Sequence, residues 1–170
     1  MECTLQKYNK TMANNSSLVT TKVVEHTNEP FFTITSESSL TKIMLTLPKT
    51  FDLPSYKYDL AKRFVTVEPT DDNKKMFIID FRKDHKKILE DLEIPFELSK
   101  KQTKVKGGRM YFDSDTNEFI YSFESSYFGE CDHFEVMSIT SPFLMQYLNG
   151  VTFKAMKCDD FIMQYDGKLI

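Results

Sequence analysis

The segment 76–92, MFIIDFRKDHKKILEDL, changes the spacing of its apolar residues part-way along. The apolar run 77–79 is short and flanked by charge, which is typical of a strand. Asp84 can cap a helix that follows this strand. The next apolar positions have helical spacing, and they are Ile88, Leu89 and Leu92. We therefore predict a strand that leads into a helix with one apolar side and one basic side.

A similar order of apolar positions occurs in the segments 32–47 and 134–148. The first matches 76–92 after a shift of 45 residues, and the second matches it with one residue deleted. Because internal repeats indicate repeated supersecondary units, the pattern predicts three strand-helix-strands units. These units span residues 31–68, 76–123 and 133–166. Chance is the alternative explanation, since any strand followed by a helix has similar spacing.

Capping residues indicate where the other two predicted helices begin and end. Ser36 or Ser38 is the expected N-cap of the first helix, and Pro48 is expected to end it. Asn149 and Gly150 are expected to close the third helix as its C-cap. All three helices are then short.

Further strands complete a β-rich pattern. They are predicted at 18–24, 63–68, 109–112, 118–123, 151–156 and 161–165. Residues 1–17 are polar, and we interpret them as a mobile arm or a weakly held first strand. We expect a single α+β domain over residues 18–170. Its sheet should be largely antiparallel, with about three short helices on one face.

Composition supports one compact intracellular domain. The chain has 170 residues, and its 15 Phe, 8 Tyr and 9 Met supply ample material for a core. Its three cysteines form no disulfide framework, and its N-terminus lacks the apolar region of a signal peptide. No apolar run is long enough to span a membrane. We expect a cytoplasmic or nuclear protein that is not secreted and makes no membrane contact.

The sequence carries no recognisable catalytic motif. It lacks GxxxxGK[ST], GxGxxG and GxSxG. Cys131 and His133 could chelate zinc, or the imidazole could activate the thiol, but structural zinc needs four ligands and no second pair has suitable spacing. We interpret Cys131 as an ordinary loop thiol. The chain is predicted to be no enzyme, with no catalytic residue, metal, cofactor or small-molecule substrate.

Positive charge gathers in two stretches that follow each other in the sequence. Lysine and arginine neutralise phosphates without reading base sequence, so duplex DNA is a candidate partner. No Phe, Tyr or Trp interrupts the basic helix face, which favours duplex backbone contact over stacking on single strands. A solubilising face, with His85 solvated on it, explains the charges equally well. The candidate nucleic-acid-binding residues are Arg82, Lys83, Lys86, Lys87, Lys100, Lys101, Lys104, Lys106 and Arg109.

Two stretches of the chain resemble DNA sliding clamps of the proliferating-cell-nuclear-antigen type. MFIIDFRKDHKKILEDLEI is similar to the strand and inner-rim helix of a clamp half-domain, and HFEVMSITSPFLMQYLNGVTFKAM with DDFIMQY is similar to the second half-domain. The resemblance implies a hole around duplex DNA, lined by Arg82, Lys83, Lys86 and Lys87. The chain departs from the family in its length, which corresponds to about one and a half clamp domains. The first unit has only Lys42 on its helix, and the third has no basic residue.

Two functions follow as hypotheses. The first is a non-enzymatic nucleic-acid-associated accessory protein, possibly a clamp-like processivity or scaffold factor. The alternative is a protein-interaction or structural subunit of a viral or multi-subunit assembly without nucleic-acid contact. Self-association through sheet edges is expected in either case, because the basic stretch 100–109 complements the acidic stretch 111–135. The candidate edge strands are Glu118–Phe123 and Phe161–Tyr165.

Overall fold

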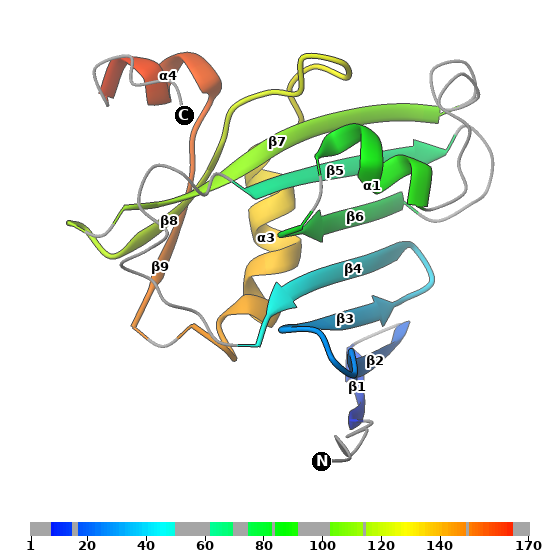
Figure 1. Ribbon diagram of the computed structural model, residues 1–170. Helices are drawn as coiled ribbons and strands as arrows, with labels where there is room; N and C mark the ends of the chain where they lie inside the picture. The colour runs from blue at the N-terminus through cyan, green and yellow to red at the C-terminus, as the bar shows by residue number, and fades with distance from the viewer. Residues whose placement is uncertain are drawn as a thin grey trace.

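One mixed sheet organises the chain. A computed structural model describes residues 8–14, 17–49, 62–69, 75–82, 84–91, 103–113, 115–148 and 150–164. Within these residues nine strands form a sheet of order β1-β2-β3-β4-β6-β5-β7-β8-β9 (Figure 1). Neighbouring strands are antiparallel except for the parallel pairs β4–β6 and β8–β9. The α+β class and the largely antiparallel sheet are therefore confirmed.

The elements have the following bounds. The strands are β1 (Tyr8–Asn14), β2 (Ser17–Glu25), β3 (Phe31–Glu37), β4 (Thr41–Pro48), β5 (Lys62–Pro69), β6 (Lys75–Asp80), β7 (Thr103–Asp113), β8 (Glu118–Ser122) and β9 (Thr152–Ala155). The helices of the described residues are α1 (His85–Asp91), α3 (His133–Leu144) and α4 (Cys158–Gln164).

The helices lie on both faces of the sheet, which corrects the prediction that all of them share one face. Strand β6 shows the division, since Phe77 and Ile79 pack in the main core, to which α3 contributes Val136 and Leu144. Ile78 points the opposite way and packs with Ile88 and Leu89 of α1. Helix α4 joins the α1 side, through the packing of Phe161 against Tyr111 and Ile120. In Figure 1, α3 lies behind the sheet and α1 in front of it.

The expected helix that ends at Pro48 is the strand β4, so that prediction is wrong. Ile43, Leu45 and Leu47 are all buried in the main core, which is the period of two expected for a strand. Ser38 caps no helix. Its hydroxyl accepts the backbone N–H of Thr41 at 3.1 Å and shapes the turn between β3 and β4.

The third segment is helical from its start. Helix α3 begins at His133, so Phe134 and Val136 are helical and not in a strand. Asp132 is the N-cap, and its side chain accepts the N–H of Glu135 at 3.2 Å. The segments 32–47, 76–92 and 134–148 therefore differ in their elements, and three strand-helix-strands units are not present.

Two details near the C-terminus also differ from the sequence prediction. Helix α3 ends at Leu144 with Met145 as its C-cap, so Asn149 and Gly150 do not close it. Gly150 has a φ of 73° in the turn before β9. The expected strand 161–165 overlaps α4, in which Phe161 is buried. The strand β8 lies between β7 and β9, so the edges of the described sheet are β1 and β9.

Several local predictions are confirmed. Asp84 caps α1, because its Oδ1 accepts the N–H of Lys87 at 2.8 Å. The hairpin of β7 and β8 has Asp113 opposite Glu118, as the turn residues between them indicate. Strand β1, for which the sequence left two alternatives open, pairs with β2 over Tyr8–Asn14. None of the helices in the described part of the chain has the length and apolar character needed to cross a membrane.

Candidate functional site

Helix α1 is held on the sheet by a histidine that the sequence analysis placed in solvent. His85 is buried, and its Nε2–H donates to the carbonyl of Gly108 in β7 at 2.8 Å. Gly107 lets the helix approach, since a Cβ there would lie 3.0 Å from the His85 ring and 2.8 Å from Cβ of Ser125. The sequence alone did not indicate this contact, because His85 was interpreted as solvated on the basic helix face.

The arginine beside α1 is neutralised within the fold. The Arg82 guanidinium donates to both carboxylate oxygens of Asp80 at 3.1 Å, and to Glu29 at 3.1 Å. It also lies 5.6 Å from the centre of the Phe31 ring. The hydrogen bonds to Asp80 raise the pKa of Arg82, with smaller contributions from both carboxylates. A phosphate would have to compete with these two carboxylates.

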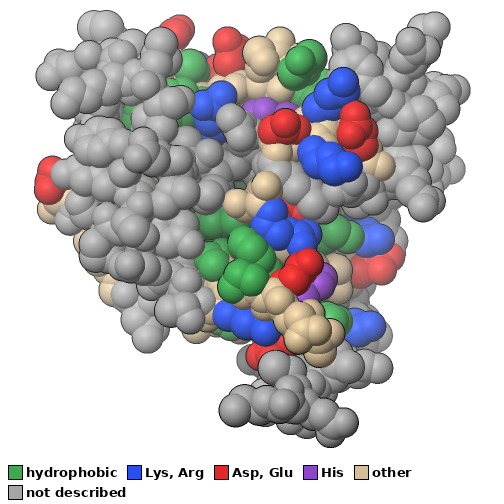
Figure 2. Space-filling view, in the orientation of Figure 1, with side chains coloured by type: hydrophobic (Ala, Val, Ile, Leu, Met, Phe, Trp, Pro, Cys, Tyr) green, Lys and Arg blue, Asp and Glu red, His purple; other side chains and the backbone are tan. Residues whose placement is uncertain are grey.

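The two remaining described cations of α1 lie on an exposed surface. Lys86 is 3.9 Å from Glu90 one turn later, and Lys87 is exposed. Figure 2 shows basic and acidic side chains intermixed on the side of the molecule that carries α1. Such exposed pairs contribute little to stability and leave the lysines accessible. Among the described residues of this surface, positive side chains alternate with acidic ones.

Two lysines of β7, Lys104 and Lys106, face away from α1. Val105 packs against α1, whereas Met110 and Phe112 belong to the core on the α3 side. Because side chains alternate along a strand, the exposed Lys104 and Lys106 lie on the α3 side.

The structure therefore divides the candidate cations that it describes between the two sides of the sheet. Arg109 is partly buried and, by the same alternation, belongs to the side of α1 and α4. Arg82, Lys86 and Lys87 share that side of the sheet, while Lys104 and Lys106 do not. Lys83, Lys100 and Lys101 lie outside the described residues.

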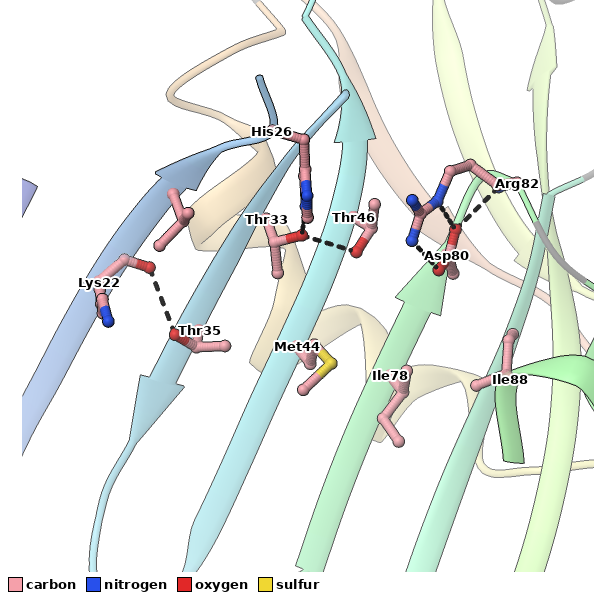
Figure 3. A pocket seen from close by; sticks show the side chains of 11 residues that line it. Lys22, His26, Thr33, Thr35, Met44, Thr46, Ile78, Asp80, Arg82 and Ile88 are labelled. Carbon is pink, nitrogen blue, oxygen red and sulfur yellow. Dashed lines mark hydrogen bonds and ion pairs between the residues drawn. The ribbon is translucent and has the colours of Figure 1, made fainter. Parts of the chain in front are cut away.

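A groove of about 400 Å³ crosses the open part of the sheet beside α1 (Figure 3). Its polar end consists of a hydrogen-bonded row, in which His26 Nε2 lies 2.6 Å from the Thr33 hydroxyl and that hydroxyl lies 3.0 Å from the Thr46 hydroxyl. The polar groups bond to each other, as do Asp80 and Arg82. The lining residues are Lys22, Val24, His26, Thr33, Thr35, Met44, Thr46, Ile78, Asp80, Arg82 and Ile88.

The Cys131–His133 pair joins the starts of α3 and α4. The thiol lies 3.5 Å from His133 Nδ1, and the opposite nitrogen, Nε2, lies 3.1 Å from Glu130. The same Glu130 oxygen accepts the N–H of Cys158 at 2.9 Å. Burial, helped by nearby carboxylates, raises the pKa of Cys131 to about 12. A raised thiol pKa leaves little thiolate at neutral pH, which opposes a role as a nucleophile.

No metal site is formed around this pair. Glu130 and Cys131 contact opposite nitrogens of the His133 ring, so the three cannot converge on one ion. Among the described residues, no group of three His, Cys, Asp or Glu side chains could hold a metal ion. Burial lowers the pKa of His133, while Glu130 acts in the opposite direction. The arrangement is that of a structural contact.

The outer side of α3 carries four exposed residues without charge. Phe134 and Met145 are 59% and 54% exposed, and Ser138 and Pro142 between them are also exposed. Their spacing of i, i+4, i+8 and i+11 places them on one line along the helix. We call these four residues the α3 stripe. The sequence alone did not indicate this surface, because the spacing of its apolar residues predicted a strand at Phe134.

The charge pattern of α3 is unusual for a surface helix. Glu135 is its one acidic residue, and this carboxylate forms an ion pair with Lys75 of β6. Surface helices normally turn charged residues to solvent, and a helix that is uncharged on all sides is normally covered. Val136 and Leu144 account for the covered side, since both are buried against the sheet. The outer side of α3, which carries the α3 stripe, therefore has no charged residue.

No protein-family model matches the chain, and no curated protein matches it.

Proposed function

We propose that this chain is a non-enzymatic protein-interaction subunit that docks onto another protein surface through the α3 stripe. The observation that carries the proposal is the exposure of Phe134 and Met145 on a helix whose outer side has no charge. The two large apolar side chains lie on one line of the helix, separated by Ser138 and Pro142, and exposed apolar surface is one feature of protein–protein interaction sites. Phe and Met are also enriched at interface centres, where charged residues are depleted.

The position of the stripe favours a binding role over a role in folding. Helix α3 is already held by Val136 and Leu144 in the core and by the bond of Thr140 to the Tyr121 hydroxyl at 2.9 Å. Phe134 and Met145 are largely exposed, so they contribute little to that packing. Replacing them with polar residues should leave the fold intact while removing the interface.

A second candidate is weak contact with the backbone of duplex nucleic acid. The exposed Lys86 and Lys87 on α1 favour it, because lysines neutralise phosphates without reading sequence. Arg82 supports it less, since Asp80 and Glu29 already engage its guanidinium. The clamp-like arrangement belongs to this candidate and needs several chains around one duplex.

The native mass of the tagged chain, in extracts of the cells that make it, tests the protein-interaction proposal. The wild-type chain should migrate in an assembly, and the double variant Phe134→Ser/Met145→Ser should migrate as a monomer. Leu40→Ser is the matched control, because Leu40 is 77% exposed in the turn between β3 and β4. An unchanged assembly in the double variant would remove the α3 stripe from the function.

A further inference from the structure

We infer that α4 is a releasable latch, which in its docked position holds the start of α3 and with it the Phe134 end of the α3 stripe. The inference rests on the proposed function, because it concerns how the stripe is kept in its binding position. Helix α4 lies at one end of the molecule, beyond β9 (Figure 1). Two opposed sets of features meet beneath it: some hold the helix, and others are relieved when it leaves.

An aromatic side chain and a backbone hydrogen bond hold α4 in place. Phe161 is buried, and its ring centre lies 4.5 Å from that of Phe123 and 5.4 Å from that of Tyr111. At the first residue of α4, the Cys158 N–H donates to Glu130 at 2.9 Å. The next two residues of the helix are exposed.

The backbone beneath α4 is strained at Phe123, directly after β8. Its φ is 66°, in the left-handed region, which a bulky residue adopts only where its surroundings impose it. Asn28 and Asn117 have the same sign of φ, but asparagine enters this region readily. Phe123 is buried against Phe161, so the departure of α4 lets it return to an extended conformation.

The preceding residue, Ser122, adds a second cost to the docked position. Its side chain is fully buried, and no described group forms a hydrogen bond with its hydroxyl. Ile120, two residues earlier on β8, packs with Phe161, so Ser122 faces the side of the sheet that carries α4. A buried hydroxyl without a partner costs free energy, and water removes this cost once the site opens. Strain and desolvation therefore both favour release of α4.

The Glu130 carboxylate couples α4 to the start of α3. The oxygen that accepts the Cys158 N–H also lies 3.1 Å from Nε2 of His133, the first residue of α3. His133 is buried and is followed directly by Phe134 of the stripe. Release of α4 removes one of these two contacts, and relaxation of Phe123 changes the direction of the chain that follows it. The start of α3 should therefore loosen together with α4.

Hydrogen–deuterium exchange of the purified chain, followed amide by amide by NMR, tests the latch. The Phe161 amide donates to the Lys157 carbonyl at 3.0 Å, and it should exchange by local opening, faster than the amides of the central strand β4. Ser122→Ala should slow this exchange about tenfold, because it removes the hydroxyl that only the docked state buries. Ser126→Ala, at an exposed position, is the matched control and should leave the exchange unchanged.

Phe161→Ala tests the coupling to α3. Loss of the aromatic side chain should speed the exchange of α4 roughly a hundredfold. The amides of Glu135 and Val136, which donate to Asp132 at 3.2 and 3.1 Å, should speed up with it. Unchanged rates in β4 show that the variant is folded. If it does not fold, Cys158→Pro replaces it, because proline is tolerated at the first position of a helix and removes the N–H that Glu130 accepts.

Each result supports or overturns the latch. A wild-type α4 that exchanges only as slowly as β4 overturns its release, and unchanged or faster exchange in Ser122→Ala overturns the cost beneath it. A Phe161→Ala variant that loosens α4 but not Glu135 and Val136 overturns the coupling to the stripe. These measurements need no partner, so they stand apart from the native-mass assay, in which Phe161→Ala should weaken the assembly. A wild-type chain that does not assemble contradicts the proposed function alone.

Discussion

Gly107→Ala should destabilise the protein by a steric mechanism that the structure makes explicit. Gly107 lies in β7, where its N–H donates to the Gly129 carbonyl at 3.1 Å and its carbonyl accepts the N–H of Cys131 at 3.3 Å. The added methyl would lie 2.8 Å from Cβ of Ser125 and 3.0 Å from the His85 ring. The loop that leads into α3 must therefore shift, and the His85 ring at the start of α1 is crowded as well.

The expected cost follows from this double overlap. Carbon contacts below 3.0 Å essentially never occur for real Cβ atoms, so at least one neighbour must shift. Overpacking of a well-packed core typically costs about 1–3 kcal/mol. We expect about 2 kcal/mol here, because both neighbours are buried and Ser125 also accepts the N–H groups of Tyr127 and Phe128. Lys106→Ala, at an exposed position of the same strand, should cost under about 0.5 kcal/mol.

Urea unfolding of Gly107→Ala, Ser125→Gly and the double variant measures the effect. If the Ser125 contact causes the cost, the double variant should be more stable than the sum of the single effects predicts. Additive effects would refute the contact with Ser125 as the cause of the cost. A Gly107→Ala variant as stable as Lys106→Ala would refute the reasoning as a whole, because β7 would then tolerate a side chain beneath α1.

Three further results are expected. Asp84→Ala should lower the unfolding free energy by about 1 kcal/mol in urea titrations, because the Lys87 N–H loses its acceptor, and Asp84→Asn should retain most of it. If α1 contacts duplex DNA, Lys86→Glu/Lys87→Glu should weaken binding uniformly and flatten its salt dependence; an unchanged salt slope would exclude this surface. The pKa of His133 is lower in the folded protein than in the unfolded chain, so as the pH drops the unfolded chain binds the proton at a higher pH. Stability should therefore fall as pH drops through about 6.5, and His133→Gln should show a shallower loss between pH 7 and 5.

Local sequence signals predicted correctly those elements whose residue pattern fits only one kind of secondary structure. The turn residues 113–117 between two apolar stretches predicted the β7–β8 hairpin. Asp84 predicted the start of α1, since a carboxylate before an amphipathic stretch has few other roles. These predictions depend on neighbours in the sequence, which is why one sequence was enough.

Elements with ambiguous spacing were predicted wrongly. Ile43, Met44 and Leu47 fit a helix, but Ile43, Leu45 and Leu47 fit a strand, and pairing with β3 and β6 decided for the strand. Phe134 and Val136 fit a strand equally well until Asp132 capped the helix that contains them. The local pattern could not predict the order of strands in the sheet. Strands β4 and β6 are neighbours in the sheet and run parallel, although β5 lies between them in the sequence.

The candidate site was predicted only in part for the same reason. The sequence placed the cations of α1 and β7 close together along the chain, but the alternation of β7 puts Lys104 and Lys106 on the α3 side of the sheet. The exposed side of α3 depends on which of its faces meets the core. That choice is made by the packing of Val136 and Leu144, which no local pattern specifies.

Oxidative footprinting of Met145 tests the central claim most directly. Dilute purified chain and intact cells that make it are exposed to the same oxidant, and sulfoxide at each methionine is quantified by mass spectrometry. Met110 is 1% exposed and serves as the internal control that stays unmodified in both samples. We predict that Met145, at 54% exposure, oxidises rapidly in the dilute chain and is protected in cells. Equal oxidation of Met145 in both samples would contradict a protein interface on α3.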